Sequence, residues 1–237
     1  MTTAVSLEKV LVVAAHPDDE VLGCGGTIRR TLREGGWVRV LVLGEGSSCR
    51  FPLGQIASSE AVAAITQRRR FAERALAALG VDEFRFGDLP CGRFDTQPII
   101  DIGKTIEIEI ADFKPDAVIT HFGRDANSDH RHTFDAVLAA TRPVPGSRVR
   151  TVMSFEIPSS TEWRFIDVFQ PDCFIDIDMD IDAKVAAFDC YAATEGGAYP
   201  FPRSEEGLRT LARYRGMQAG LRHAEAFQTV RRVVPHA

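Results

Sequence analysis

A histidine and three carboxylates lie within five residues near the start of the chain, in the segment His16-Pro17-Asp18-Asp19-Glu20. Imidazole nitrogens and carboxylate oxygens are ligands that zinc accepts in catalytic sites. A divalent metal lowers the pKa of bound water from about 15.7 to about 7 and polarises a carbonyl placed beside it. A carboxylate that is not a ligand can take a proton from that water. These residue types therefore indicate metal-assisted hydrolysis.

A third metal ligand must come from elsewhere in the chain, because His16 and one carboxylate are too few to hold a metal tightly. The best candidate lies in Asp129-His130, which follows an apolar run at residues 116–120 and precedes a helical pattern. The carboxyl ends of parallel strands meet at the same edge of a sheet, where open α/β folds bind their ligands. We therefore expect His16, Asp19 and His130 to meet at that edge.

The segment around His16 is well placed to present side chains at the end of a strand. Residues 10–15 (VLVVAA) are continuously apolar, as is typical of a strand buried on both faces. Pro17 fixes its own φ and biases His16 toward an extended conformation, so that a stiff turn follows the strand. Acidic residues after this turn suit the first positions of a helix, because the helix dipole favours negative charge there.

Apolar strands and amphipathic helices alternate along the first two thirds of the chain. The expected strands are residues 10–15, 37–43, 82–86, 116–120 and 150–155, and the expected helices include residues 21–34 and 60–79. Glycines in the first helix would let it lie close to the sheet or leave room beside the metal. The alternation predicts an α/β fold, with a Rossmann-like, doubly wound, mostly parallel sheet over residues 1–155.

Residues 156–237 have a different pattern and are expected to form a smaller C-terminal α+β region. Residues 173–181 alternate apolar and acidic side chains, which favours a half-exposed strand. Residues 182–194 and 204–221 have helical patterns, and a last strand is expected at 227–233. We expect this region to form part of the substrate wall over the metal, within a single domain that spans residues 1–237.

Composition excludes several classes of partner. The net charge of -5 with interspersed signs argues against a nucleic-acid surface, which needs clustered Lys and Arg. Five widely spaced cysteines without a CxxC pair favour free thiols in a reducing compartment. The amino-terminal MTTAVSLEKV is unlike a signal peptide, and no apolar run reaches membrane-spanning length. We expect a cytoplasmic protein without membrane insertion, and the oligomeric state, including a homo-oligomer, stays open.

Two motifs resemble those of the PIG-L/LmbE-like family of metal-dependent N-acetyl-sugar deacetylases. These are AHPDDE at residues 15–20 and DxNxDHR at residues 125–131, and the resemblance extends to the short stretches SSTEW, PRS and AEAF. It implies hydrolysis of the N-acetyl group of an N-acetylglucosamine-type sugar or glycoconjugate, with release of acetate. The cofactor implied is Zn²⁺, although Fe²⁺ and Co²⁺ can share the same ligand set.

The resemblance also implies roles for individual residues. It makes Asp18 the general base, and His16, Asp19 and His130 the metal ligands. Glu20 is interpreted first as an acid at the start of a helix and second as support for the metal ligands.

Two further residues are candidates for substrate binding. Arg68, counted back from LGV at residues 79–81, matches the family's substrate-binding arginine. An exposed Arg68 without a function is the alternative. Asp95, in the turn-rich segment 87–98, could contact sugar hydroxyls, although polar residues in such segments commonly serve the turns themselves.

The chain departs from the family at the position of the donor to a developing oxyanion. Many members have a histidine three residues before the ligand histidine, where this chain has Asn127. Asn127 could donate through its amide nitrogen, or His121 at the end of the fourth strand could take that role. Asp129 could orient one of these groups or a metal-bound imidazole, or it could be an ordinary acid at a helix start.

Two other functions remain as alternatives. His16, Asp18 and His130 also match the two-histidine, one-carboxylate iron site of Fe(II) oxygenases. That site commonly lies on an all-β barrel, whereas this chain alternates β and α. The third interpretation is a sugar-binding relative without catalytic activity. This interpretation is weaker, because the chain contains all the expected metal ligands and the general base.

Overall fold

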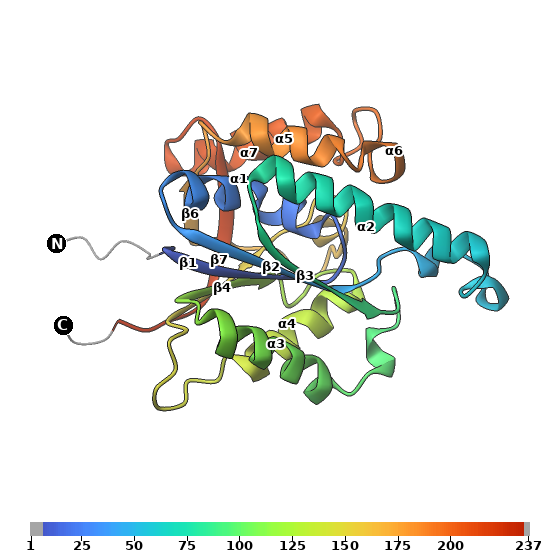
Figure 1. Ribbon diagram of the computed structural model, residues 1–237. Coiled ribbons are helices and arrows are strands. Elements are labelled where there is room, and N and C mark those ends of the chain that lie inside the picture. Colours follow the sequence, from blue (N-terminus) through green and yellow to red (C-terminus); the bar gives the residue numbers. More distant parts are fainter. Residues whose placement is uncertain (1–6, 235–237) are drawn as a thin grey trace.

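One seven-stranded sheet runs through the computed structural model, which describes residues 7–234 (Figure 1). Its strand order is β3-β2-β1-β4-β5-β7-β6, and the first five of these strands are parallel. They are β1 (Lys9–Ala14), β2 (Trp37–Gly44), β3 (Glu83–Leu89), β4 (Ala117–His121) and β5 (Thr151–Phe155). The predicted mostly parallel α/β sheet is confirmed. The first six residues of the amino-terminal segment considered above lie outside the described residues.

The C-terminal region adds two antiparallel strands to the β5 edge of this sheet. They are β7 (Ala224–Arg232), which pairs with β5, and β6 (Cys173–Asp176), which pairs with β7. The strand predicted at 173–181 is too long. The Asp176 side chain accepts the N–H of Asp178 at 2.9 Å, and this local turn ends the strand although the apolar-acidic alternation continues.

Helices cover both faces of the sheet (Figure 1). The helices α1 (Asp19–Arg33), α2 (Ser59–Leu79), α5 (Ile181–Asp189) and α7 (Glu205–Ala219) lie on one face, and α3 (Ile99–Phe113) and α4 (Ser128–Ala140) lie on the other. The predicted helix at 182–194 is two helices, α5 and the short α6 (Ala192–Glu195). No helix within residues 7–234 has the length and apolar character needed to span a membrane.

Strand β1 lies at the centre of the sheet and is buried on both faces. Val10 and Val12 belong to the core beneath α1 and α2, whereas Leu11 and Val13 belong to the core beneath α3 and α4. This two-sided burial explains the unbroken apolar run before His16. It also makes the end of β1 a rigid place from which to present side chains.

The first helix packs tightly against the sheet. A Cβ atom on Gly23 would lie 2.3 Å from the ring of Phe155 in β5, so the helix could not approach so closely with a larger residue there. The helix bends at Cys24, and the Glu225 carboxylate accepts the N–H of Gly26 at 2.9 Å beyond the bend. The expectation that glycines bring this helix close to the sheet is confirmed.

Candidate active site

The candidate site lies where the order of the strands reverses. β1 and β4 are neighbours, with Val10 paired to Ala117 and Val12 to Ile119, while β2 lies on the other side of β1. The chain therefore leaves β1 and β4 in opposite directions, which opens a crevice at their carboxyl ends. His16 follows β1 directly, and α4 begins a few residues after β4.

Three of the predicted residues come together in this crevice and could hold a metal ion. Ligand atoms of His16, Asp19 and His130 all lie within 4.8 Å of one another, and all three side chains are buried. Asp19 Oδ2 is 3.5 Å from His16 Nδ1 and 3.4 Å from His130 Nε2. Residues more than a hundred positions apart thus face one another across the β1/β4 boundary, as the sequence analysis expected.

The other ring nitrogen of each histidine faces a second carboxylate. His16 Nε2 is 2.9 Å from Asp129 Oδ2, and His130 Nδ1 is 3.0 Å from Asp125 Oδ1. Carboxylates in this position fix the orientation and tautomer of metal-binding imidazoles. The geometry favours the orienting role for Asp129. Asp125 has the same relation to His130 and was given no role in the sequence analysis, although it is the first residue of the DxNxDHR motif.

The electrostatic field of the buried carboxylates favours a positive charge beside Asp19. Burial lowers the pKa of His130, but Asp19 and then Asp125 outweigh this effect and raise it to about 10. Burial raises the pKa of Asp19, but the charge and hydrogen bond of His130 outweigh this effect and hold the pKa well below its usual range. A buried group of carboxylates that stabilises cationic neighbours in this way is suited to binding a metal cation.

Asp18 adopts an unusual backbone conformation directly before α1. Its φ is +112°, which is uncommon for a residue other than glycine. The Glu20 side chain fixes this turn, because it accepts the N–H of Asp18 at 3.0 Å and the hydroxyl of Tyr191 at 2.8 Å. Burial, and then the proximity of Asp18, raise the pKa of Glu20 to about 8. Strained residues that the surroundings hold in place are frequent in active sites.

Two arginines contact the Asp18 carboxylate. Arg203 donates to Asp18 Oδ2 at 3.0 Å, and Arg68 Nη2 lies 3.2 Å from the same oxygen. Burial raises the pKa of Asp18 to about 6, against the opposing effect of Arg68 and Arg203. A carboxyl group whose pKa lies near neutrality can both accept and return a proton at a pH near 7.

Arg68 lies beneath the turn that contains Asp18. It donates from Nε and Nη2 to the carbonyl oxygen of Pro17 at 3.0 and 2.8 Å, and its Nη1 donates to Glu195. The alternative of an exposed, uninvolved Arg68 is wrong, because the residue is 5% exposed. Contact between Arg68 and a substrate stays a prediction.

The comparison with known families agrees with this geometry. The family model for PIG-L, described as GlcNAc-PI de-N-acetylase, matches residues 11–141, more than half of the chain. The chain belongs to the PIG-L family. The resemblance noted in the sequence is thereby confirmed, and membership makes the chain an enzyme of a metal-dependent deacetylase family. The matched segment includes His16, Asp18, Asp19 and His130.

Curated relatives and solved structures extend the likeness along the chain. A diacetylchitobiose deacetylase of Thermococcus kodakarensis is 28% identical over 240 residues, which cover 97% of this chain and 86% of the relative. The 1D-myo-inositol 2-acetamido-2-deoxy-alpha-D-glucopyranoside deacetylase of Mycobacterium sp. (strain KMS) is 30% identical over 227 residues, or 78% of this chain and 73% of the relative. The structure of GalB, the 4-carboxy-2-hydroxymuconate hydratase of Pseudomonas putida KT2440, has a TM-score of 0.74 at 26% identity, with 97% and 99% of the two chains covered.

The two oxyanion-donor candidates of this PIG-L member have different surroundings. Asn127 caps α4, where its side-chain oxygen accepts the N–H of Asp129 at 2.9 Å. His121 Nε2 accepts the N–H of Ala15 at 2.8 Å, and burial and His130 lower the pKa of His121 to about 3. His121 is therefore neutral with its proton on Nδ1, for which residues 7–234 provide no hydrogen-bond partner. The identity of the donor stays a prediction.

Asp95, the other predicted sugar contact, directly follows Phe94, whose backbone N–H donates to Asp129 Oδ1 at 3.2 Å. It is exposed in the short 3₁₀ helix Phe94–Thr96, which follows β3. A role for Asp95 in substrate binding stays a prediction.

The C-terminal region supplies three site residues that the sequence analysis did not identify. Tyr191 contacts Glu20, Glu195 contacts Arg68, and Arg203 contacts Asp18. Of these, Arg203 alone carried a sequence signal, because it lies in the PRS stretch that resembles the family.

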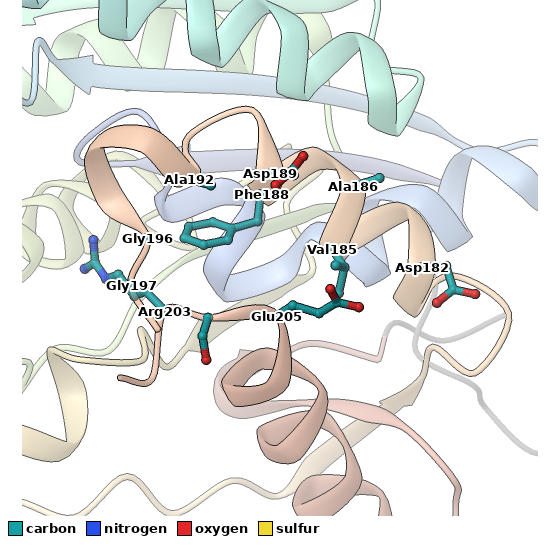
Figure 2. Close-up of a pocket in the computed structure, with 11 residues that line it drawn as sticks. Asp182, Val185, Ala186, Phe188, Asp189, Ala192, Gly196, Gly197, Arg203 and Glu205 are labelled. Carbon is teal, nitrogen blue, oxygen red and sulfur yellow. The ribbon is translucent and has the colours of Figure 1, made fainter. Parts of the chain in front are cut away.

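A cavity of about 560 Å³ lies beside Arg203 (Figure 2). Its lining comes from α5, α6 and the start of α7, and includes Phe188, Gly196 and Glu205. The candidate metal ligands His16, Asp19 and His130 do not line this cavity. Arg203 connects the two, because it borders the cavity and also donates to Asp18.

Replacement of Arg68 by alanine is expected to lower the free energy of unfolding by about 3 kcal/mol, because it removes one buried cationic partner from both Asp18 and Glu195. Asp18 keeps Arg203 and Glu195 keeps Arg50, which limits the loss. Guanidinium denaturation measures this change. The matched control is Arg69→Ala, since the Arg69–Asp88 pair is exposed and contributes about 0–1 kcal/mol. Equal losses in the two variants would contradict the structural role assigned to Arg68.

Proposed function

We propose that this chain is a zinc-dependent hydrolase that removes the N-acetyl group from an N-acetylglucosamine-type amino sugar or its conjugate. The products are acetate and a free amine, and the substrate is a small molecule in the cytoplasm. The meeting of His16, Asp19 and His130 beside Asp18 is the observation that carries this proposal. The names of the curated relatives support the substrate class.

The donor set fits a catalytic zinc ion. Two imidazoles and one carboxylate are typical of catalytic sites, which keep a position open for water or substrate. Asp129 and Asp125 face the second ring nitrogens of His16 and His130, as expected for histidines that bind a metal. Fe²⁺ and Co²⁺ remain open alternatives with the same ligands. When bound, such an ion supplies a polarised acyl oxygen and a more acidic water.

The side chains around the ligands would then carry the proton transfers. Asp18 takes a proton from the attacking water and gives it to the nitrogen of the departing amine, which breaks the amide bond. Arg68 and Arg203 hold the Asp18 carboxylate in place from one side. Glu20 accepts the backbone N–H of Asp18 and so fixes the turn from which this carboxylate projects. Asn127 or His121 donates to the oxyanion.

A screen of N-acetylated sugars and glycoconjugates with zinc-loaded protein tests the proposal directly. We expect acetate release in step with the appearance of a free amine, from diacetylchitobiose or an N-acetylglucosamine conjugate. Lack of acetate from every member of the panel, with zinc bound at one ion per chain, would contradict the proposal. A positive result would also exclude the non-catalytic sugar-binding alternative.

The two rival reactions can be separated in parallel assays. The oxygenase interpretation required Asp18 on the metal, whereas the Asp18 carboxylate contacts Arg68 and Arg203. Oxygen consumption with Fe²⁺ and 2-oxoglutarate would support the oxygenase interpretation. The similarity to GalB favours a second candidate, hydration of 4-carboxy-2-hydroxymuconate. That reaction adds water across a double bond and releases no acetate, so the two activities are distinguishable.

Asp125→Asn is expected to raise the zinc dissociation constant by about 10–100-fold, because the variant loses the carboxylate that orients His130. Competition with a chromophoric chelator measures this constant. Asp135→Asn, which changes an exposed carboxylate on the same helix as His130, is the control and should bind zinc like the unmodified chain. Equal affinities in all three proteins would show that Asp125 has no orienting role.

A further inference from the structure

Two cysteines from different loops meet at the rim of the candidate site. Cys49 follows β2 and Cys91 follows β3, and their Sγ atoms are 2.9 Å apart. Both are free thiols in the structure. The parallel arrangement of β2 and β3 places the two loops at the same sheet edge as His16. This pair has no part in the proposed deacetylation.

The thiol pair is directly connected to the residues that orient the metal ligands. The backbone N–H of Gly92, which follows Cys91, donates to Asp129 Oδ2 at 2.6 Å. The same oxygen contacts His16 Nε2. Cys91 Sγ, the His16 ring and the Asp129 carboxylate offer ligand atoms within 4.8 Å of one another. A change at Cys91 therefore acts on the hydrogen bonds that hold His16.

The two thiols differ in a way that suits stepwise thiol-disulfide exchange. Cys49 is exposed, whereas Cys91 is 7% exposed and its backbone N–H donates to Glu45 Oε1 at 2.8 Å. The hydrogen bond from Cys91 lowers the pKa of the Cys49 thiol to about 6, which favours a thiolate at the accessible position. An accessible thiolate beside a second cysteine is the arrangement found in redox-sensitive sites.

We propose that Cys49 and Cys91 form a redox-modification site that reacts with low-molecular-weight disulfides and closes into a reversible protein disulfide. The Cys49 thiolate attacks one sulfur of the small disulfide, whose S–S bond breaks and releases one thiolate. The Cys91 thiol then attacks Cys49 Sγ, which breaks the mixed disulfide, and its proton passes to the second small thiolate as that group leaves. Two protein thiols are oxidised, and one small disulfide is reduced to two thiols.

Closure of this disulfide is expected to weaken metal binding. An S–S bond is about 2.05 Å long, so the two sulfur atoms must approach each other from their present separation of 2.9 Å. The Gly92 backbone packs against Cys49, since a Cβ atom on Gly92 would lie 3.3 Å from Cys49 Cβ, so a shift of Cys49 toward Cys91 also moves Gly92. The movement therefore displaces the Gly92 N–H from Asp129. A weakened orienting contact to His16 raises the zinc dissociation constant by up to about 10-fold.

Exposure of the reduced full-length chain to glutathione disulfide, followed by alkylation and peptide mass spectrometry, tests the modification. We expect a cross-link between residues 49 and 91, reversed by dithiothreitol and absent from Cys49→Ser and Cys91→Ser. Cys24, Cys173 and Cys190 should remain alkylated and serve as internal controls. A stable mixed disulfide at Cys49 without the cross-link, or two unreacted thiols, would overturn the proposal. This assay needs no substrate, so its failure is distinct from failure of the proposed deacetylation.

Zinc titration of the oxidised and reduced protein tests the link to Asp129. The oxidised chain is expected to bind zinc more weakly, while Cys49→Ser treated in the same way keeps one affinity throughout. A cross-linked chain with unchanged zinc affinity would overturn the link between the thiol pair and His16.

Discussion

Replacement of Asp18 by asparagine is expected to lower kcat by about 10²–10⁴-fold while zinc remains bound. Asparagine has nearly the same shape as aspartate and tolerates the positive φ at this position, so the turn before α1 is preserved. The amide cannot accept the proton of the attacking water. His16, Asp19 and His130 are expected to keep their positions, because the contacts among them do not involve the Asp18 carboxylate. Acetate release and zinc content, measured on the same sample, check both halves of this prediction.

The control for Asp18→Asn must account for the loss of a buried negative charge. Asp180→Asn serves this purpose, because Asp180 is also buried and its carboxylate accepts two hydrogen bonds from Arg33, away from the candidate site. This variant should be destabilised without a change in kcat. Wild-type kcat in zinc-loaded Asp18→Asn would show that Asp18 is not the base and would direct attention to other residues near the metal.

The sequence was sufficient to predict the centre of the site because its signals are local. The apolar runs identified β1 and β4, Pro17 marked the turn after β1, and parallel pairing predicts that their ends meet. The meeting of His16 with His130 follows from those three facts. The same reasoning predicted most of the helices and strands to within a few residues.

The contacts from the C-terminal region could not be predicted in this way. Tyr191 reaches Glu20 from 171 positions away, and Arg203 reaches Asp18 from 185 positions away. These contacts depend on how α5, α6 and the following loop fold back over α1, which no periodicity in the sequence specifies. The approach of Cys49 to Cys91 depends in the same way on the conformations of two irregular loops.

Replacement of His130 by alanine is expected to abolish both zinc binding and turnover, in contrast to the loss of Asp18. His130 supplies a candidate ligand atom, whereas Asp125 only orients the His130 ring. The loss of zinc affinity in His130→Ala should therefore exceed the loss of about 10–100-fold expected for Asp125→Asn. Thermal unfolding with and without zinc measures binding independently of catalysis, because a ligand that binds the folded state raises Tm. The unmodified chain should show this rise and His130→Ala should not.

Saturating zinc separates the role of a ligand from that of an orienting residue. Asp125→Asn is expected to recover turnover when zinc is raised above its weakened dissociation constant, since the ligands themselves remain. His130→Ala is expected to stay inactive at any zinc concentration that the protein tolerates. His132→Ala, which changes a half-buried histidine of the same helix whose Nδ1 contacts the Ser128 carbonyl oxygen, should behave like the unmodified chain. Cys91, His16 and Asp129 also offer ligand atoms close to one another, so the decisive variant is His130→Ala combined with Cys91→Ser. One tightly bound zinc ion per chain in this double variant would contradict the assignment of His130 as a ligand, because His16 and Asp19 alone offer too few donors to retain it.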